Sequence, residues 1–205
     1  MHPNTIPPNT KKVLNKIKKT NFLKSFYLTG GTALSLYLGH RESEDLDFFS
    51  KDNFDPVRLQ QEVKGLGKLK DVDIQPCTLN LFLDQAQLQF LYYPYRLIKP
   101  YVRWQEVNLS SVIDIACTKL QTIGMRGSKK DFIDIYFLLK TYSLNELFDS
   151  LEEKYQGVDY NIPHILKALV YFNDAEAQPM PRMHKKVPWG EVKKEVTKSA
   201  KAYKF

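Results

Sequence analysis

Apolar and polar residues repeat with two different periods along this chain, and the period changes near residue 110. Before that point, short runs with strand-like alternation are separated by single helical segments. The pattern predicts strands at residues 26–29, 45–49, 68–75, 78–83 and 86–93, and helices at residues 11–19, 32–39 and from 55 to 65 or 67. Residues 1–8 are rich in Pro and Asn, which predicts a loose N-terminal lead, that is, a segment without regular secondary structure.

From residue 110 onward the apolar residues recur at helical spacing, and serines stand where helix N-caps are expected. The pattern predicts helices at residues 112–126, 129–141, 144–155, 161–172 and 189–203, with the Pro-rich residues 178–189 as a loop. The sequence therefore predicts an α+β protein. A mixed β-sheet domain with flanking helices spans residues 1–108, a helical domain spans residues 109–205, and the functional site is expected between them.

The composition is that of an ordinary globular domain, with 43% hydrophobic and 26% charged residues in a chain of 205. No stretch approaches 18 apolar residues, so we expect no membrane span, and the N-terminus lacks a hydrophobic signal core. The two cysteines, Cys77 and Cys117, lie in apolar surroundings and predict two buried free thiols in a reducing cytoplasm.

The formal net charge is +7, and the lysines that produce it gather near the two ends of the chain. Such a balance favours a polyanionic partner, either nucleic acid or an acidic protein. The alternative is a set of solvated helix faces. The clusters are Lys11, Lys12, Lys16, Lys18, Lys19 and Lys24, and Lys185, Lys186, Lys193, Lys194, Lys198, Lys201 and Lys204.

The segment from Tyr27 to Phe49, YLTGGTALSLYLGHRESEDLDFF, carries the clearest chemistry. A diglycine turn between a strand and a helix lets backbone N–H groups approach a phosphate, and the helix adds its positive N-terminal dipole. Two carboxylates spaced two apart on a strand point to one face. Such a pair is the usual protein contribution to a Mg²⁺ site completed by substrate phosphates.

The order strand, Gly-Gly, helix, Arg, Ser-x-Asp-x-Asp closely resembles the AbiEii/AbiGii family, the nucleotidyltransferase-like toxins of abortive-infection and toxin–antitoxin systems. The resemblance implies a nucleotidyltransferase-like sheet domain, an NTP substrate, a Mg²⁺ or Mn²⁺ cofactor and an antitoxin partner. It implies metal ligation by Asp45 and Asp47. The residues implied to contact the nucleotide are Gly30, Gly31, Thr32, Arg41, Ser43 and Arg126.

A second group of charged residues lies in the helical half. Lys119 and Arg126 are seven residues apart on one predicted helix, and Asp131 and Asp134 share a face of the next. Spacing alone favours an inter-helix salt-bridge network. The resemblance, which spans residues 26–139, favours catalysis instead. Lys119 would then offset triphosphate charge, while Asp131 or Asp134 holds the Lys or Arg in place or acts on an incoming hydroxyl.

The sequence departs from this pattern where metal-dependent nucleotidyltransferases carry a third carboxylate. The inward-facing position of the predicted strand at residues 86–93 is Gln89, and an uncharged amide is a poor Mg²⁺ ligand. Asp84 is interpreted as a turn residue, and Asp71 and Asp73 as a pair in a Lys-rich strand. This departure argues against two tightly bound metal ions, and it leaves open the alternative that the protein is a catalytically degenerate member of the family.

Residues 92–96, YYPYR, and the nearby Tyr101, Arg103 and Trp104 form an aromatic and basic segment. Such side chains stack bases in single-stranded RNA, but they also fill seams between domains. Three functions remain open at this stage. One is a metal-dependent transfer of NMP from NTP to RNA or protein, favoured by the Asp45/Asp47 pair. Another is a degenerate module that binds nucleic acid or a partner protein, favoured by Gln89. The third is a small-molecule nucleotidyltransferase of the antibiotic-modifying kind, which shares the Asp-x-Asp chemistry but fits the basic charge less well than an RNA acceptor does.

Overall fold

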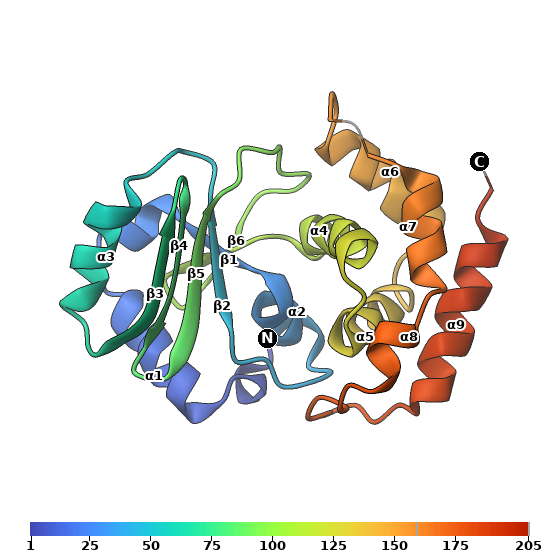
Figure 1. Ribbon diagram of the computed structural model, residues 1–205, viewed down its shortest axis with the longest axis horizontal. Coiled ribbons are helices and arrows are strands. Elements are labelled where there is room, and N and C mark those ends of the chain that lie inside the picture. Colours follow the sequence, from blue (N-terminus) through green and yellow to red (C-terminus); the bar gives the residue numbers. More distant parts are fainter. Residues whose placement is uncertain (159, 205) are drawn as a thin grey trace. The chain divides into compact units, whose positions relative to one another are not determined.

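The computed structural model describes residues 1–158 and 160–204 (Figure 1). The chain divides into two compact units. Met1–Tyr95 and Pro100–Ser111 form the sheet unit, whereas Arg96–Lys99 and the chain from Val112 onward form the helical unit.

The sheet unit contains a seven-stranded mixed sheet in the order β3-β4-β5-β2-β1-β7-β6. Strand β1 pairs in parallel with β7, strand β2 pairs in parallel with β5, and the remaining pairs are antiparallel. The predicted α+β class and mixed sheet are confirmed. The strands are β1 (Tyr27–Thr29), β2 (Leu46–Ser50), β3 (Leu69–Gln75), β4 (Thr78–Leu83), β5 (Ala86–Tyr92), β6 (Val102–Trp104) and β7 (Val107–Leu109).

The sequence pattern missed β6 and β7. Each has only three residues, and the turn between them, Gln105 and Glu106, carries positive φ at both positions. Two-residue turns of this kind are usually recognised in a sequence by an Asn-Gly or Asp-Gly pair. Here neither residue is a turn former, so the hairpin had no local signal.

The helices of the sheet unit are α1 (Pro8–Ile17), α2 (Gly30–Leu38) and α3 (Pro56–Lys64). Helix α1 packs against β5, and α3 packs against β3 and β4. The Asp55 side chain caps α3 by accepting from the N–H groups of Val57 and Arg58, as predicted. Phe48 and Phe90 stack in the core on one side of the sheet. Because side chains alternate along a strand, the neighbouring residues of β2 and β5 point to the opposite side.

The prediction of a loose N-terminal lead was wrong. Residues Pro3–Thr5 form a 3₁₀ helix, and Thr5 and Ile6 are buried. The His2 N–H donates to the Leu36 carbonyl at 2.7 Å. The prolines interpreted as loop signals instead begin helices, where a missing N–H costs nothing.

The helical unit contains α4 to α9, and its predicted caps are in place at Ser128, Ser143 and Asn161. The helix predicted to reach residue 172 ends earlier, and a short helix α8 follows it. The bounds are α4 (Val112–Met125), α5 (Lys129–Leu138), α6 (Leu144–Lys154), α7 (Ile162–Leu169), α8 (Asn173–Glu176) and α9 (Trp189–Ala202). No helix among the described residues is both long and apolar enough to cross a membrane.

A buried ion pair fastens the segment Arg96–Lys99 to the helical unit. The Lys154 ammonium donates to Asp114 at 2.8 Å and to the Arg96 carbonyl at 2.9 Å. Asp114 also accepts from the N–H groups of Ile98 and Lys99. Because every partner is hydrogen-bonded, this pair avoids the cost of an isolated buried charge.

The two cysteines are free, but only Cys117 is buried, which corrects the prediction for Cys77. Burial raises the pKa of the Cys117 thiol to about 12. At pH 8 only about one Cys117 in 10⁴ is therefore a thiolate. We expect iodoacetamide to alkylate native Cys77 and to spare Cys117 until the chain unfolds. Peptide mass spectrometry of native and urea-treated protein checks this, and equal labelling in the native protein would contradict it.

Candidate active site

The Asp47 carboxylate lies directly over Gly30, the first residue of α2. A Cβ atom at Gly30 would stand 2.0 Å from Asp47 Oδ2, and Gly30 has φ of +67°. Both the position and the backbone conformation therefore require glycine. The first glycine of the predicted phosphate turn and the second predicted metal ligand thus lie against each other.

The next glycine makes room for two further side chains. A Cβ atom at Gly31 would stand 2.7 Å from Arg41 Nη2 and 3.0 Å from Ser43 Oγ. Arg41 is buried, and its Nη1 donates to the Glu42 carbonyl at 2.9 Å. The structure therefore brings Gly31, Arg41 and Ser43 together, although they are distant along the helix and loop.

Thr32 and Asp45 are linked through the backbone. The buried Thr32 hydroxyl donates to the Asp45 carbonyl oxygen, and this bond fixes the loop immediately before β2. Asp45 lies one residue before the strand, which corrects the predicted start at Asp45. Asp45 and Asp47 both remain partly exposed at this end of β2.

Asp47 is directly beside Gln89 across the parallel pair of β2 and β5. Side chains at paired positions point to the same face of a sheet. The sequence predicted that Gln89 stands where metal-dependent nucleotidyltransferases carry a third carboxylate. Its pairing with Asp47 is consistent with that prediction. No group of three or more His, Cys, Asp and Glu able to hold a metal occurs among residues 1–158 and 160–204. Two carboxylates fit a Mg²⁺ shell only if substrate phosphates and water complete it.

The row of paired polar residues continues beyond Gln89 to the sheet edge. Gln89 pairs with Asn80, and Asn80 pairs with Asp73. Hydrogen bonds from Gln75 and Asn80 lower the pKa of Asp73 below its ordinary value. Asp73 is thus a solvated carboxylate at the edge strand. Asp84 lies in the turn before β5 and pairs with Lys16 at 2.5 Å.

Lys119 is held between two carboxylates in the helical unit. Its Nζ lies 2.8 Å from Asp131 Oδ1 and 2.8 Å from Asp134 Oδ2. Lys119 is 8% exposed, and both aspartates are fully buried. The Ser128 hydroxyl donates to the second oxygen of Asp131 at 2.5 Å. The inter-helix network predicted as the structural alternative is therefore present in geometry, and its catalytic role stays a prediction.

Arg126 has different neighbours from Lys119. It follows the end of α4 at Met125 and lines a pocket with His164, Lys167 and Tyr171. The Arg126 N–H still donates to the Thr122 carbonyl at 2.8 Å and so closes the last turn of α4, but the described residues show no ion pair between Arg126 and Asp131 or Asp134.

The aromatic residues of the sheet unit pack on one another in a chain of rings. Tyr101 contacts Tyr27, Tyr27 contacts Phe49, Phe49 contacts Tyr93, and Tyr93 contacts Tyr95, with centroid separations of 4.7–6.1 Å. Phe49 is two residues from Asp47 on β2 and shares its face. The rings therefore lie next to the Asp47 end of the row of paired polar residues.

The family model for the nucleotidyl transferase AbiEii toxin of type IV toxin–antitoxin systems matches residues 12–79 and 92–202. The chain belongs to this family. It is therefore a toxin-type nucleotidyltransferase, which confirms the resemblance drawn from the Gly-Gly and Asp-x-Asp motifs. The two matched ranges leave out residues 80–91, the segment that carries Gln89.

An uncharacterized protein of Aquifex aeolicus (strain VF5) is 34% identical over 174 residues, covering 82% of this chain and 84% of the relative. A proposed nucleotidyltransferase from H. pylori superposes with a TM-score of 0.55 at 19% identity, over 94% of this chain and 92% of that one. The nucleotidyltransferase toxin MenT4 of Mycobacterium tuberculosis H37Rv superposes with a TM-score of 0.56 at 12% identity, over 87% and 76%. At these identities the solved structures show a shared fold.

Proposed function

We propose that this AbiEii-family nucleotidyltransferase moves a nucleoside monophosphate from a Mg²⁺-bound NTP to a hydroxyl group of an RNA acceptor. The observation that carries the proposal is the packing of Asp47 over Gly30 and of Arg41 and Ser43 over Gly31. Phosphate-binding and metal-binding groups thereby converge at the first turn of one helix.

The sheet unit supplies the binding groups for the triphosphate. The first N–H groups of α2 have no partners within the helix and attract anions. The Arg41 guanidinium and the Ser43 hydroxyl stand beside them as further donors. Asp45 and Asp47 would hold Mg²⁺ or Mn²⁺, which would neutralise phosphate charge when it is bound.

In the proposed transfer the acceptor hydroxyl oxygen bonds to the α-phosphorus, the bond from that phosphorus to the bridging oxygen breaks, and pyrophosphate leaves. The hydroxyl proton goes to solvent or to a nearby carboxylate. We propose that Lys119 offsets the charge that develops on the phosphates, and that Asp131 and Asp134 keep its ammonium in position. No covalent intermediate with the protein is needed.

RNA is the acceptor that the charge of the chain favours, because a formal charge of +7 attracts a polyanion. The biological role that follows from the family is growth inhibition, checked by an antitoxin and used in abortive infection. The proposal is tested with pure protein, each labelled NTP, Mg²⁺ and total RNA. Label in RNA that disappears with EDTA supports it. Labelled protein in place of RNA, or RNA binding without transfer, would overturn the RNA-acceptor reaction.

Gln89→Asp is expected to tighten metal binding, because it places a third carboxylate beside Asp47 on the same face of the sheet. The measurement is calorimetric titration of Mn²⁺ with a non-hydrolysable NTP present. We expect about tenfold tighter binding in the variant, and Gln87→Asp, on the same strand, is the matched control. Equal affinity of wild type and Gln89→Asp would show that Gln89 does not reach the metal.

A further inference from the structure

A pocket of about 310 Å³ lies in the helical unit between the end of α4, with the loop that follows it, and helix α7. Gly124, Met125, Arg126 and Gly127 line one wall. The opposite wall comes from α7 and the residues after it. Its volume is at the small end of ligand pockets, suited to one nucleotide unit. The pocket is lined by none of Lys119, Asp131 and Asp134, so it is a different place from the charged cluster.

Two cations line the pocket without an acidic partner. Arg126 and Lys167 are exposed, and no ion pair to either occurs among residues 1–158 and 160–204. Asp174 also lines the pocket, which leaves one excess positive charge. Some other cations of this unit are paired with carboxylates, as Lys193 is with Glu176 and Arg96 is with Glu153. The pocket therefore offers unneutralised donors to an anion.

His164 fixes the shape of the pocket. Its Nε2 lies 2.7 Å from the Gly124 carbonyl oxygen, so Nε2 carries the proton that is donated. A Cβ atom at Gly124 would stand 3.5 Å from His164 Cδ2, an ordinary contact. This bond joins the first turn of α7 to the last turn of α4, so the segments that carry Lys167 and Arg126 are held together at the pocket.

The same pocket carries large apolar surface. Tyr171 is 52% exposed and Met125 is 88% exposed. Exposed aromatic rings beside Arg and Lys are the combination that binds single-stranded nucleic acid, because the ring stacks on a base while the cation contacts the phosphate. A site for a free phosphate alone would need no such ring.

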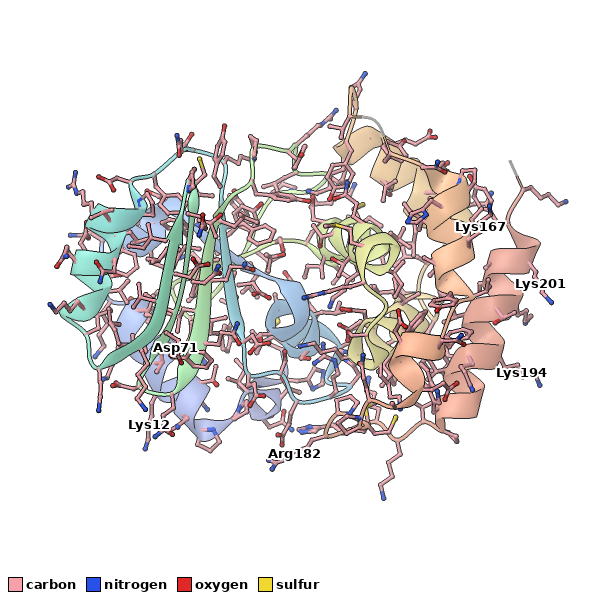
Figure 2. All side chains as sticks on the ribbon, in the orientation of Figure 1. Lys12, Asp71, Lys167, Arg182, Lys194 and Lys201 are labelled. Atoms are coloured by element: carbon pink, nitrogen blue, oxygen red, sulfur yellow. The ribbon has the colours of Figure 1, made fainter. Side chains whose placement is uncertain are left out.

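Further positive charge lies on another helix of the same unit. Helix α7 packs against α9. Figure 2 shows Lys167 on α7 and Lys194 and Lys201 on α9 pointing outward from these two helices. Lys194 and Lys201 lie on α9, outside the residues that line the pocket, so they contribute only to the general attraction for a polyanion.

We propose that this pocket binds one phosphodiester and the adjoining base of a single-stranded part of the RNA acceptor. The inference rests on the proposed function for the identity of the RNA. Arg126 and Lys167 contact the phosphate, and Tyr171 stacks on the base. Arg126 thereby serves the acceptor, in place of the NTP contact predicted from the sequence. A simpler account is that Lys167 and Arg126 compensate the C-terminal dipoles of α7 and α4, which would need no ligand.

The test is fluorescence anisotropy of the full chain with a short labelled single-stranded RNA, at several salt concentrations. Arg126→Gln and Tyr171→Ala should each weaken binding about tenfold. Arg126→Gln should also lower the slope of log affinity against log salt by about one, whereas Tyr171→Ala should leave the slope unchanged. Lys201→Gln is the matched control, since it removes the same charge from α9 outside the pocket.

Loss of affinity in both pocket variants with a near-normal Lys201→Gln supports the site. Equal weakening by Arg126→Gln and Lys201→Gln would show diffuse attraction only, and normal binding by Tyr171→Ala would exclude the base contact. A shift in thermal midpoint without a change in RNA binding would establish the helix-dipole account. Wild-type transfer with unaltered RNA binding by both pocket variants overturns this inference alone. Pocket-dependent binding without any transfer overturns the proposed reaction and leaves the pocket standing.

Discussion

Replacing Asp47 with asparagine will reduce nucleotidyl transfer by at least about 10²–10³ in kcat, the usual loss for one electrostatic contact to a transition state. Asparagine keeps the size of the side chain over Gly30, so the phosphate turn retains its geometry. What it removes is the negative charge. With Gln89 as the neighbour, Asp45 is then the remaining carboxylate at this end of β2. A single carboxylate supplies less charge and fewer ligands to Mg²⁺ than a pair, so the metal should bind more weakly and be less well placed.

The measurement is steady-state transfer of labelled NMP, with folding checked by thermal unfolding. Asp73→Asn is the matched control, because Asp73 belongs to the same polar row and is exposed at the edge strand. It should transfer at the wild-type rate. Transfer by Asp47→Asn above about a tenth of wild type would show that this carboxylate does not act on the metal.

Gly30→Ala is a companion to this variant, since it leaves every carboxylate in the sequence. The added Cβ would stand 2.0 Å from Asp47 Oδ2, so the Asp47 side chain must move. Alanine also disfavours a φ of +67° by roughly 1 kcal/mol or more. A folded Gly30→Ala protein with the activity of Asp47→Asn would tie the loss to the position of the carboxylate as well as to its charge.

Local pattern predicted the part of this site that lies on the strands. Alternation along residues 78–83 and 86–92 is regular, because each strand has one buried side and one partly exposed side. Counting along that alternation was enough to select Gln89, and the register then paired it with Asp47. No comparable sequence pattern predicted that the Arg41 side chain packs against Gly31. This packing depends on the loop after α2 and on Thr32 holding the Asp45 carbonyl, both of which are tertiary contacts.

Helical spacing did not predict which charged groups would meet. The Arg126 N–H still donates to the Thr122 carbonyl at the end of α4, but Arg126 lines a pocket with His164, which is distant in sequence. Asp131 and Asp134, both inside α5, lie on one face as their spacing predicted, and both contact Lys119. Periodicity assigns a residue to a helix face, whereas the partner that the residue meets there depends on tertiary packing.

Lys119→Met will lower both stability and transfer, and the two effects have different causes. Removing the ammonium takes away the cation that Asp131 and Asp134 share, while both carboxylates stay fully buried. Breaking a buried pair in this way typically costs about 3–5 kcal/mol of unfolding free energy. Loss of activity in this variant alone would therefore be uninformative, since misfolding could explain it.

The triple variant Lys119→Met, Asp131→Asn, Asp134→Asn separates the two causes. Removing all three charges together leaves neither buried carboxylate without this cation, and such replacements are often neutral for stability. We expect the urea midpoint to return close to that of wild type. If Lys119 stabilises the transition state, the transfer rate of the folded triple variant should stay about 10²–10³ below that of wild type.

A matched control comes from the buried pair of Lys154 and Asp114, which lies in the same helical unit and holds the segment Arg96–Lys99. Lys154→Met with Asp114→Asn likewise removes both charges of a buried pair, so it should stay close to wild type in stability and keep the transfer rate per folded molecule. The decisive comparison is kcat at a temperature where both proteins are folded. If the triple variant regains wild-type kcat along with its stability, the Lys119 cluster is a structural network between α4 and α5. If it is stable and inactive while the Lys154 variant is active, the positive charge of Lys119 belongs to the chemistry.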